Sequence, residues 1–272
     1  MQSFKAKLLT EYEIVHKCEK TTIIYPYIRD DIGTEHIFCV SPLHGRSFVL
    51  RHKRNGKWII GKGNGLSYTS HSYLLTSLSY GETWGGLTLE NAIRDYNIGN
   101  QVNKLGIKTN HMEGVINIKK KIYSNGIECQ AGLLQYSVEC PYRLTDFGFI
   151  PKKELHEYLD KWDVKGQEYY LYAAKILIKN LRILHDNHIM HNAMHAQNYT
   201  WSLELLDFEA SRSNKYPFSN IDYERCVPIL IEAEILQTYE IINYVSWCLG
   251  ETMDYSKVES IFHDYGFVLM SI

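Results

Sequence analysis

The stretch Ile183–Glu209, which reads ILHDNHIMHNAMHAQNYTWSLELLDFE, decides the fold. Apolar residues recur every three to four positions over 168–187, a segment that begins before this stretch and ends inside it. This periodicity predicts a long amphipathic helix. A loop that begins at His191 follows, with Asn198 seven residues later and Asp207 inside a short apolar run. A tight loop followed by a short β-hairpin brings the last two residues together.

The same order of residues resembles the protein-kinase signature, in which H-x-D-x-x-x-x-N precedes D-F-G. The resemblance implies that Asn198 and Asp207 hold Mg²⁺, which bridges the phosphates of ATP. The loop histidine of kinases is structural, so we expect a structural role for His191. The alternative is that Asn198 is a turn residue and Asp207 a surface carboxylate.

The first half of the chain reads as antiparallel strands. Apolar runs at 36–40, 48–50 and 57–62 are candidate strands, and Asn55-Gly56 between the last two predicts a type I′ hairpin. Lys62 ends the third strand, where a kinase-like fold anchors phosphates. Further strands are expected at 115–118 and 132–138.

Residues 63–86 are rich in Gly, Ser and Thr, which is typical of a loop or a lid. A helix is expected from Thr88 to Leu105, with Gly106 as its C-cap. One side of this helix carries an apolar stripe, which consists of Leu89, Ile93, Tyr96 and Val102. Asp95 lies on the same helix, and we expect its carboxylate to form an ion pair with Lys62, as a strand lysine and a helix glutamate do in kinases.

We therefore predict an α+β, two-lobed protein-kinase-like fold with a β-rich N-lobe at 1–145 and a compact helical C-lobe at 146–272. The hinge is expected at 141–151. Two or three helices close the chain, of which the clearest runs from Ile229 to Leu249.

Several motifs in a fixed order also resemble the selenoprotein O family, a kinase-like group that transfers AMP from ATP to protein hydroxyls. The matching segments lie between residues 38 and 210 and are KGNGLSYT at 62–69, IRDY at 93–96, LGIKTN at 105–110, CPYRLT at 140–145 and HNAMHAQN at 191–198. The resemblance implies that Lys62 and Arg143 contact phosphate, that Asp95 orients the lysine, and that ATP and Mg²⁺ are required.

The chain departs from both family patterns at the catalytic base. Ala193 stands where kinases have the catalytic aspartate, and Gln197 stands where the selenoprotein O pattern has aspartate before the metal-binding asparagine. Tyr136 replaces an arginine of that family. His195 is the candidate base, because neutral imidazole accepts a proton near pH 7. The alternative is that His195 only hydrogen-bonds within the loop.

Three functions remain open on these residues. The first is a transferase that moves AMP or phosphate from ATP to a hydroxyl of a protein or small molecule. The second is a pseudokinase that binds a nucleotide or a partner without turnover, which the missing aspartate favours. The third is a small-molecule phosphotransferase, which the short C-lobe favours.

Composition and charge argue against several other classes of protein. The 272 residues carry a formal net charge of −2, so the basic footprint of a nucleic-acid-binding protein is missing. No apolar run reaches the ~20 residues that span a bilayer, and the N-terminal stretch does not read as a signal peptide. The six cysteines form no C-x-x-C pair, so we expect a cytoplasmic protein with reduced thiols.

A zinc site is the remaining alternative for the central stretch. Four histidines recur there at spacings of three, three and four, namely His185, His188, His191 and His195. Such spacing can supply zinc ligands, but the Asn-rich sequence between the histidines favours an irregular loop.

Overall fold

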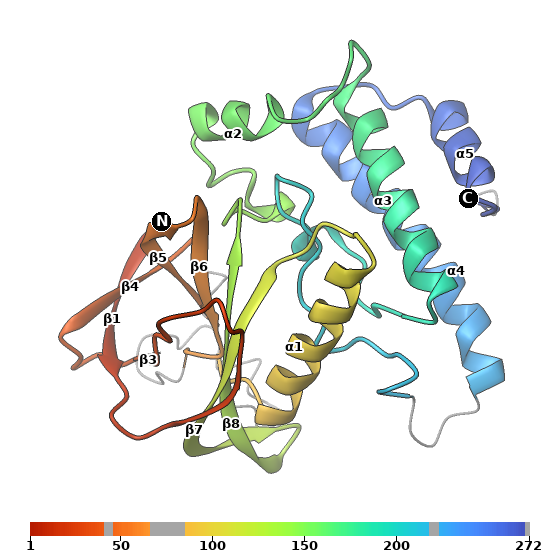
Figure 1. Ribbon diagram of the computed structural model, residues 1–272. Coiled ribbons are helices and arrows are strands. Elements are labelled where there is room, and N and C mark those ends of the chain that lie inside the picture. The colour runs from red at the N-terminus through yellow and green to blue at the C-terminus, as the bar shows by residue number, and fades with distance from the viewer. Residues whose placement is uncertain (41–45, 66–84, 218–222, 270–272) are drawn as a thin grey trace. The chain divides into compact units, whose positions relative to one another are not determined.

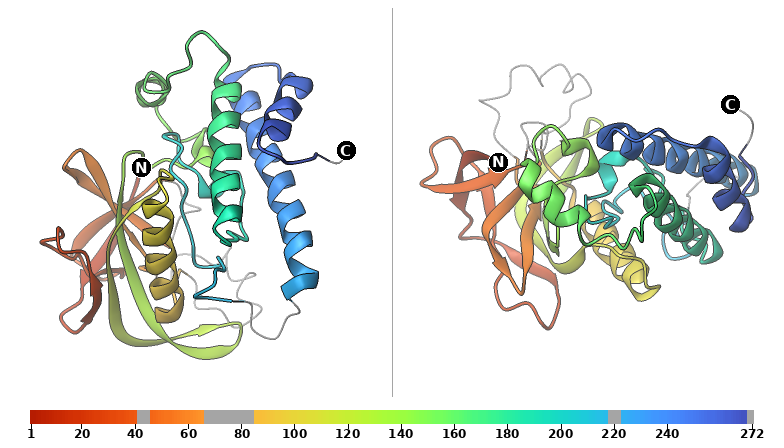
Figure 2. Two further views of the ribbon diagram at one scale, coloured as in Figure 1. Left: turned by 45° about the vertical axis from the view of Figure 1, so that its right-hand side comes forward. Right: turned by 90° about the horizontal axis from the view of Figure 1, so that it is seen from above.

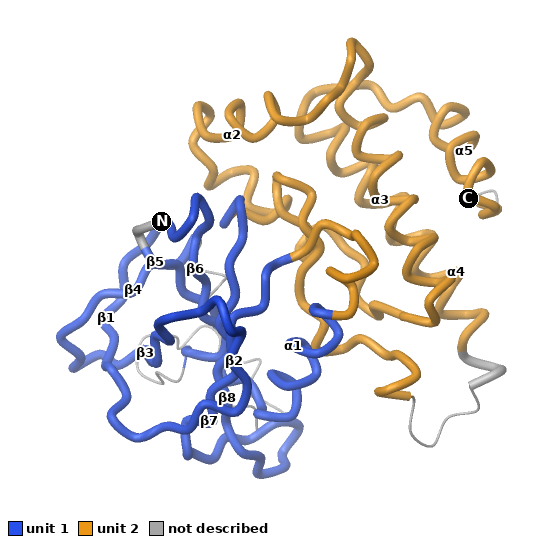
Figure 3. The backbone as a smooth tube through the Cα atoms, in the orientation of Figure 1, with its two compact units in different colours: residues 1–100, 110–141 blue, residues 101–109, 142–272 orange. Residues whose placement is uncertain are grey.

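The computed structural model describes residues 1–40, 46–65, 85–217 and 223–269 (Figure 1). The chain forms two compact units, of which one comprises residues 1–100 and 110–141 and the other residues 101–109 and 142–272 (Figure 3). The first unit is built on an antiparallel sheet and the second mainly on helices. The class is therefore α+β. The structure changes unit between Pro141 and Tyr142, whereas the sequence predicts a boundary between residues 145 and 146.

One sheet organises the described part of the first unit, and every strand pairing in it is antiparallel. Its strands occur in the order β2-β7-β8-β6-β5-β4-β1-β3. They are β1 (Gln2–Leu8), β2 (Glu13–Lys17), β3 (Tyr27–Arg29), β4 (Glu35–Cys39), β5 (Ser47–Arg54), β6 (Lys57–Lys62), β7 (His111–Ser124) and β8 (Ile127–Val138). The antiparallel meander β4-β5-β6 predicted from the sequence is confirmed.

The hairpin between β5 and β6 turns at Asn55 and Gly56, which have φ angles of 52° and 77°. Positive φ at both central residues is what a type I′ turn needs, so the sequence signal is confirmed. The longer β7–β8 hairpin turns in the same way at Asn125 and Gly126, with φ of 51° and 75°. That second Asn-Gly pair was available in the sequence, and its strands extend well beyond the predicted segments.

Helix α1 (Leu89–Lys104) matches the predicted helix, and Gly106 follows it with a φ of 81°, as a C-cap glycine does. The buried face of α1 differs from the predicted apolar stripe. Leu89, Ile93 and Tyr96 are only half-buried, and the side chains that are fully buried are Ala92, Asp95, Ile98 and Val102. The buried face of α1 is therefore centred on Asp95, a charged residue, and not on the predicted apolar stripe.

Helices make up most of the second unit. They are α2 (Lys152–Leu159), α3 (Tyr169–Asp186), α4 (Tyr223–Leu249) and α5 (Tyr255–Asp264), and short 3₁₀ turns lie at Leu144–Asp146 and Ala196–Asn198. Helices α3 and α4 lie side by side, and α5 packs against α3 (Figure 2). The predicted helices at 168–187 and 229–249 are confirmed, although α4 begins earlier and includes Pro228.

Two further sequence expectations concern the lid and the membrane. The predicted lid at 63–86 falls for the most part outside the described residues, which resume at residue 85. Among the helices of the described segments, none combines the length and the apolar character needed to cross a bilayer.

Candidate functional site

The first cluster of predicted site residues lies in the sheet unit and joins β6 to α1. Lys62 is the last residue of β6 and pairs with Leu134 of β8. Its Nζ lies 2.8 Å from Oδ2 of Asp95, and both side chains are buried. The ion pair predicted from the sequence is therefore confirmed.

The neighbouring residue on β6 shows how tightly this end of the strand is packed. Gly61 lies opposite Phe48 of β5, and a Cβ atom on Gly61 would lie 1.8 Å from Cε1 of the Phe48 ring. Only glycine fits there. Because successive residues of a strand face opposite sides of the sheet, the Phe48 ring covers the side of β6 that faces away from the Lys62 side chain.

The second cluster lies in the helical unit and centres on Arg143. Its backbone N–H donates to Oδ2 of Asp146 at 2.7 Å, which holds the turn that follows. Its Nη1 donates to the carbonyl oxygen of Gln197 at 2.8 Å and to Oδ1 of Asn198 at 3.1 Å. The same nitrogen lies 4.0 Å from Oδ2 of Asp207. A single guanidinium thus connects the predicted amide and carboxylate ligands.

Asn198 is held in one orientation by its hydrogen bonds. Its Nδ2 donates to the carbonyl oxygen of Ala193 at 3.0 Å, which leaves Oδ1 to face Arg143. Its own carbonyl oxygen accepts from the N–H of Leu206 at 2.8 Å. The loop and the segment that contains Asp207 are therefore connected through backbone atoms, as the predicted convergence requires.

Asp207 has a left-handed backbone conformation, with φ of 69°. Such a conformation is uncommon outside glycine, and aspartate and asparagine adopt it more readily than most residues. The neighbours Leu206 and Phe208 are buried, while the Asp207 carboxylate keeps 14% of its surface exposed. The turn in the backbone therefore lets a carboxylate reach the surface from an otherwise buried segment, and backbone strain of this kind concentrates at functional sites.

His191 has a structural role, as the sequence predicted. It is fully buried, its Nε2–H donates to the carbonyl oxygen of Leu206 at 2.9 Å, and its ring meets Phe208 edge to face at 5.2 Å. Burial lowers the pKa of His191, so the ring is neutral at pH 7. Since Leu206 precedes Asp207, this hydrogen bond positions the carboxylate-bearing segment.

His195 is exposed at the start of the 3₁₀ turn. Partial burial lowers the pKa of its imidazole, the Asp207 carboxylate opposes that shift, and the Arg143 guanidinium adds to it. The imidazole is thus in the field of both charged groups of the cluster and is neutral near pH 7. Neutral imidazole is the form that accepts a proton.

The four histidines do not form a zinc site. The Nε2 of His185 lies 2.7 Å from Oε2 of Glu234 on α4, and the Nε2–H of His191 donates to the carbonyl oxygen of Leu206. Among the residues that the structure describes, no three His, Cys, Asp or Glu side chains are grouped to hold a metal ion.

Two residues that the sequence reasoning missed hold the loop from α4. Oε1 of Glu234 accepts the backbone N–H of Asn192 at 2.7 Å, and Oε1 of Gln237 accepts that of Met194 at 3.0 Å. Glu234 is buried together with Thr238, one turn later. The sequence signal that could have found Glu234 is its spacing of four residues from Thr238, because two polar residues then lie within one apolar stripe of the helix.

The oxygen donors of the second cluster suit Mg²⁺. This ion is bound by one or two carboxylate or amide oxygens of the protein, with water and substrate phosphates completing the octahedron. Asp207 would supply the charge and Asn198 the neutral oxygen. Asn198 Oδ1 already accepts from Nη1 of Arg143, and its second lone pair could face an ion.

The structure thus places the six predicted site residues in two groups. Lys62 and Asp95 form a buried pair in the sheet unit, whereas the remaining four belong to the helical unit, namely Arg143, His195, Asn198 and Asp207. Tyr136, which replaces a family arginine, is buried on β8.

Comparison with known proteins adds no family to this description. No protein-family model matches the chain, and no curated protein matches it in sequence.

Proposed function

We propose that the chain is an ATP- and Mg²⁺-dependent transferase with a two-lobed, protein-kinase-like fold, which moves AMP or phosphate from ATP to a hydroxyl of a protein or small molecule. The observation that carries this proposal is the buried pair of Lys62 and Asp95. The pairing was predicted only because the sequence resembles kinase-like families, and the two residues lie on different elements, 33 positions apart.

In this proposal Lys62 contacts the phosphates of ATP and Asp95 holds the ammonium in place. Asn198 and Asp207 hold the metal, which neutralises charge on the phosphates. Arg143 adds a positive charge that is buried and directed by its contact with Gln197. The acceptor oxygen forms a bond to phosphorus, the bond to the bridging oxygen breaks, and pyrophosphate leaves if AMP is moved, or ADP if phosphate is moved.

The hydroxyl proton needs an acceptor, and the loop offers one side chain for it. Ala193 has no acceptor group, and an amide such as Gln197 does not take up a proton at pH 7. His195, neutral and close to the charge of Asp207, can take the proton. Transfers of this kind depend mainly on positioning and on electrostatic stabilisation, so a weak base is sufficient.

A second function is favoured by one specific contact. Arg143 donates to the same Asn198 oxygen that a metal would use, so a positive charge already lies beside that oxygen. A pseudokinase that binds a nucleotide through Lys62 and Arg143 without turnover would keep this contact. The two functions differ in their need for Mg²⁺, which the pseudokinase would not have.

The test is incubation with Mg²⁺ and ATP labelled separately at the α and γ phosphates, in the presence of the protein itself and of candidate acceptors. Covalent α label supports AMP transfer, and covalent γ label supports phosphate transfer. Lys62→Met and Asp207→Asn should each abolish labelling. ATP binding without labelling, unaffected by removal of Mg²⁺, would support the pseudokinase, and no ATP binding at all would refute both functions.

A further inference from the structure

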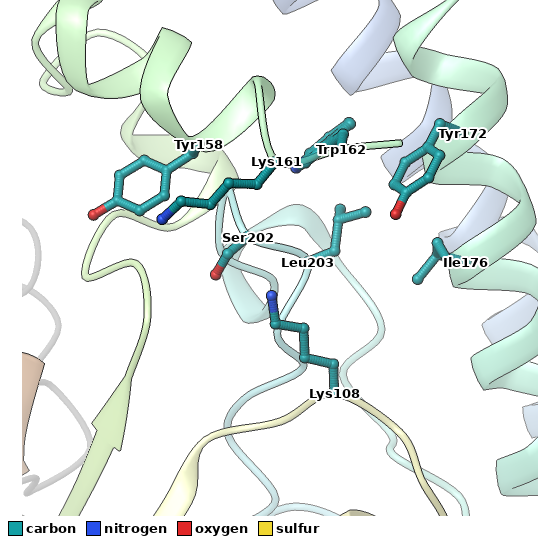
Figure 4. Close-up of a pocket in the computed structure, with 8 residues that line it drawn as sticks. All are labelled: Lys108, Tyr158, Lys161, Trp162, Tyr172, Ile176, Ser202 and Leu203. Carbon is teal, nitrogen blue, oxygen red and sulfur yellow. The ribbon is translucent and has the colours of Figure 1, made fainter. Parts of the chain in front are cut away.

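A separate cavity lies within the helical unit, and none of the predicted nucleotide-site residues lines it. Its volume is about 130 Å³. Its walls come from α2, the segment after α2, α3, the turn that follows Asn198, and the segment after α1 (Figure 4). The lining residues are Lys108, Tyr158, Lys161, Trp162, Tyr172, Ile176, Ser202 and Leu203.

One side of the cavity is a rigid aromatic wall. The Nε1–H of Trp162 donates to the carbonyl oxygen of Trp201 at 3.1 Å, which fixes the indole plane. Tyr172 stacks on Trp162 with ring centroids 5.6 Å apart and an interplanar angle of 26°. Ile176, one helical turn after Tyr172, and the buried Leu203 complete this apolar side (Figure 4). A wall held in this way is already formed before any ligand arrives, which lowers the cost of binding.

The opposite side of the cavity is polar and positively charged. Lys108 extends toward Ser202, and Lys161, from a different segment of the chain, extends toward Tyr158 (Figure 4). The Lys161 ammonium also lies 5.2 Å from the centre of the Tyr158 ring. None of the eight lining residues is acidic. The charged side chains in the lining are therefore the two lysines.

Ser202 differs from the lysines in the hydrogen bonds that it can offer. Its Oγ donates to Oε2 of the buried Glu204 at 2.7 Å and lies 3.0 Å from the hydroxyl of Thr200. The carboxylate behind it thus engages the hydroxyl proton. Toward the cavity, the Ser202 oxygen can only accept, which suits a ligand hydroxyl.

The volume limits the apolar part of a ligand to one ring. An apolar protein cavity of ~150 Å³ holds one benzene molecule, and this cavity is of that size. Aromatic walls favour a stacked or edge-on ring, and two ammonium groups favour an anion at its end.

We propose that this cavity binds a small ligand that consists of one aromatic ring and an anionic group, either an aryl carboxylate or an aryl phosphate. The ring packs against Trp162 and Tyr172, and the anion lies between the ammonium groups of Lys108 and Lys161. A hydroxyl on the ring donates to the oxygen of Ser202.

The test is titration of the full chain with benzoate, 4-hydroxybenzoate and phenyl phosphate, monitored by calorimetry and by the NMR signal of the Trp162 Nε1–H. Uncharged benzyl alcohol and inorganic phosphate are the matched probes. We expect an aryl anion to bind at least about tenfold more tightly than either. Whichever of benzoate and phenyl phosphate binds more tightly identifies the anionic group of the ligand as a carboxylate or a phosphate.

Variants locate the binding within the molecule. Lys108→Met and Lys161→Met should each weaken binding of the preferred probe by about five- to tenfold. Ile176→Trp should block binding because the indole fills the cavity. Lys179→Met, an exposed lysine on the same α3 helix outside the cavity, should change nothing. Equal binding of charged and uncharged rings, no saturable binding at millimolar concentrations, or no shift of the Trp162 signal in the unaltered chain would overturn the proposal.

Discussion

The Nζ of Lys62 lies 2.8 Å from Oδ2 of Asp95, and each of the two side chains exposes only 1% of its surface. Moving two charges out of water costs several kcal/mol for each ion, which their mutual attraction largely offsets without a clear net gain. A buried pair of this kind is therefore poorly explained by stability alone. A requirement for a fixed ammonium group explains it better.

Removing one partner of this pair should be far more damaging than removing both. Lys62→Met leaves a buried carboxylate without its ammonium partner and should lower the free energy of unfolding by about 3–5 kcal/mol. The double variant Lys62→Met/Asp95→Leu places apolar groups of similar size in the same space and should regain most of that loss. Urea unfolding of the two variants and the unaltered chain measures both values.

An exposed pair in the same sheet serves as the control for this experiment. Lys121 and Glu128 lie 3.9 Å apart and expose 58% and 54% of their side chains, so Lys121→Met should cost less than ~1 kcal/mol. Measurement of ATP affinity separates the structural role of Lys62 from its proposed role in ATP binding. The double variant should be stable yet should not bind ATP, and recovery of ATP binding together with stability would remove Lys62 from the site.

Asp207→Asn should abolish Mg²⁺-dependent ATP binding while the fold is kept. Asparagine is one of the few residues that tolerate the left-handed φ of 69° at this position, but its amide does not supply the charge that the ion needs. Calorimetric titration with ATP, with and without Mg²⁺, measures the effect.

His195→Ala serves as the comparison for activity, in whichever transfer assay the labelled ATP reveals. A positioned base contributes ~10²–10⁴-fold, but His195 is exposed, whereas the proposed metal ligand Asn198 is buried. We expect the loss in kcat/KM to be much smaller than for Asp207→Asn. An equal loss, with removal of a rate limb near pH 6–7, would identify His195 as an essential base.

The charges around His195 predict how its pKa responds to their removal. The Asp207 carboxylate raises this pKa and the Arg143 guanidinium lowers it, against a background of burial that lowers it. Asp207→Asn should therefore lower the pKa of His195 further, and Arg143→Gln should raise it. NMR titration of the imidazole gives both shifts, and an unchanged pKa in both variants would place His195 outside the reach of the cluster.

The elements predicted from the sequence were those whose pattern is local and strong. The β5–β6 hairpin has an Asn-Gly turn, and α3 has a complete apolar stripe, so both were found. The first strand, β1, has only Ala6 fully buried among its seven residues, and such a strand lacks the alternation that periodicity detects. It exists because β3 and β4 pair with it on either side.

The candidate site divides in the same way. Lys62, Asp95, Asn198 and Asp207 could be selected because motif spacing fixes them relative to one another along the chain. Glu234 lies more than 40 residues after the loop that it holds, and no local pattern connects the two. The left-handed backbone at Asp207, between the buried Leu206 and Phe208, could not be predicted either, since no local sequence signal marks it.

Glu234 should prove essential to the loop. Its two oxygens bind the Nε2 of His185 and the backbone N–H of Asn192, each at 2.7 Å. Glu234→Leu leaves both partners unpaired in a buried place and should cost about 2–4 kcal/mol. Glu234→Gln keeps one oxygen acceptor and should cost less. Chemical unfolding gives the two free energies, and faster hydrogen exchange at Asn192 in the leucine variant alone would confirm the assignment.

His191 should make the protein less stable in mild acid. Its folded-state pKa lies below the ordinary value of about 6.5, so between these two values the unfolded chain binds more protons than the folded chain. The free energy of unfolding therefore rises with pH in this window and falls as the pH drops below about 6.5, by at most ~1.4 kcal/mol per pH unit for one proton. Below the folded-state pKa the contribution of His191 no longer changes.

His191→Gln tests this dependence, because the glutamine amide can still donate to the carbonyl oxygen of Leu206 but does not take up a proton. The variant should be less stable than the unaltered chain at pH 7, since it loses the ring contact with Phe208. It should also lose less stability between pH 7 and pH 5. The control is His263→Gln, at an exposed position of α5, which should leave the slope unchanged. Urea unfolding at each pH gives the slopes, and an identical slope for His191→Gln and the unaltered chain would show that burial of His191 is not the source of the acid sensitivity.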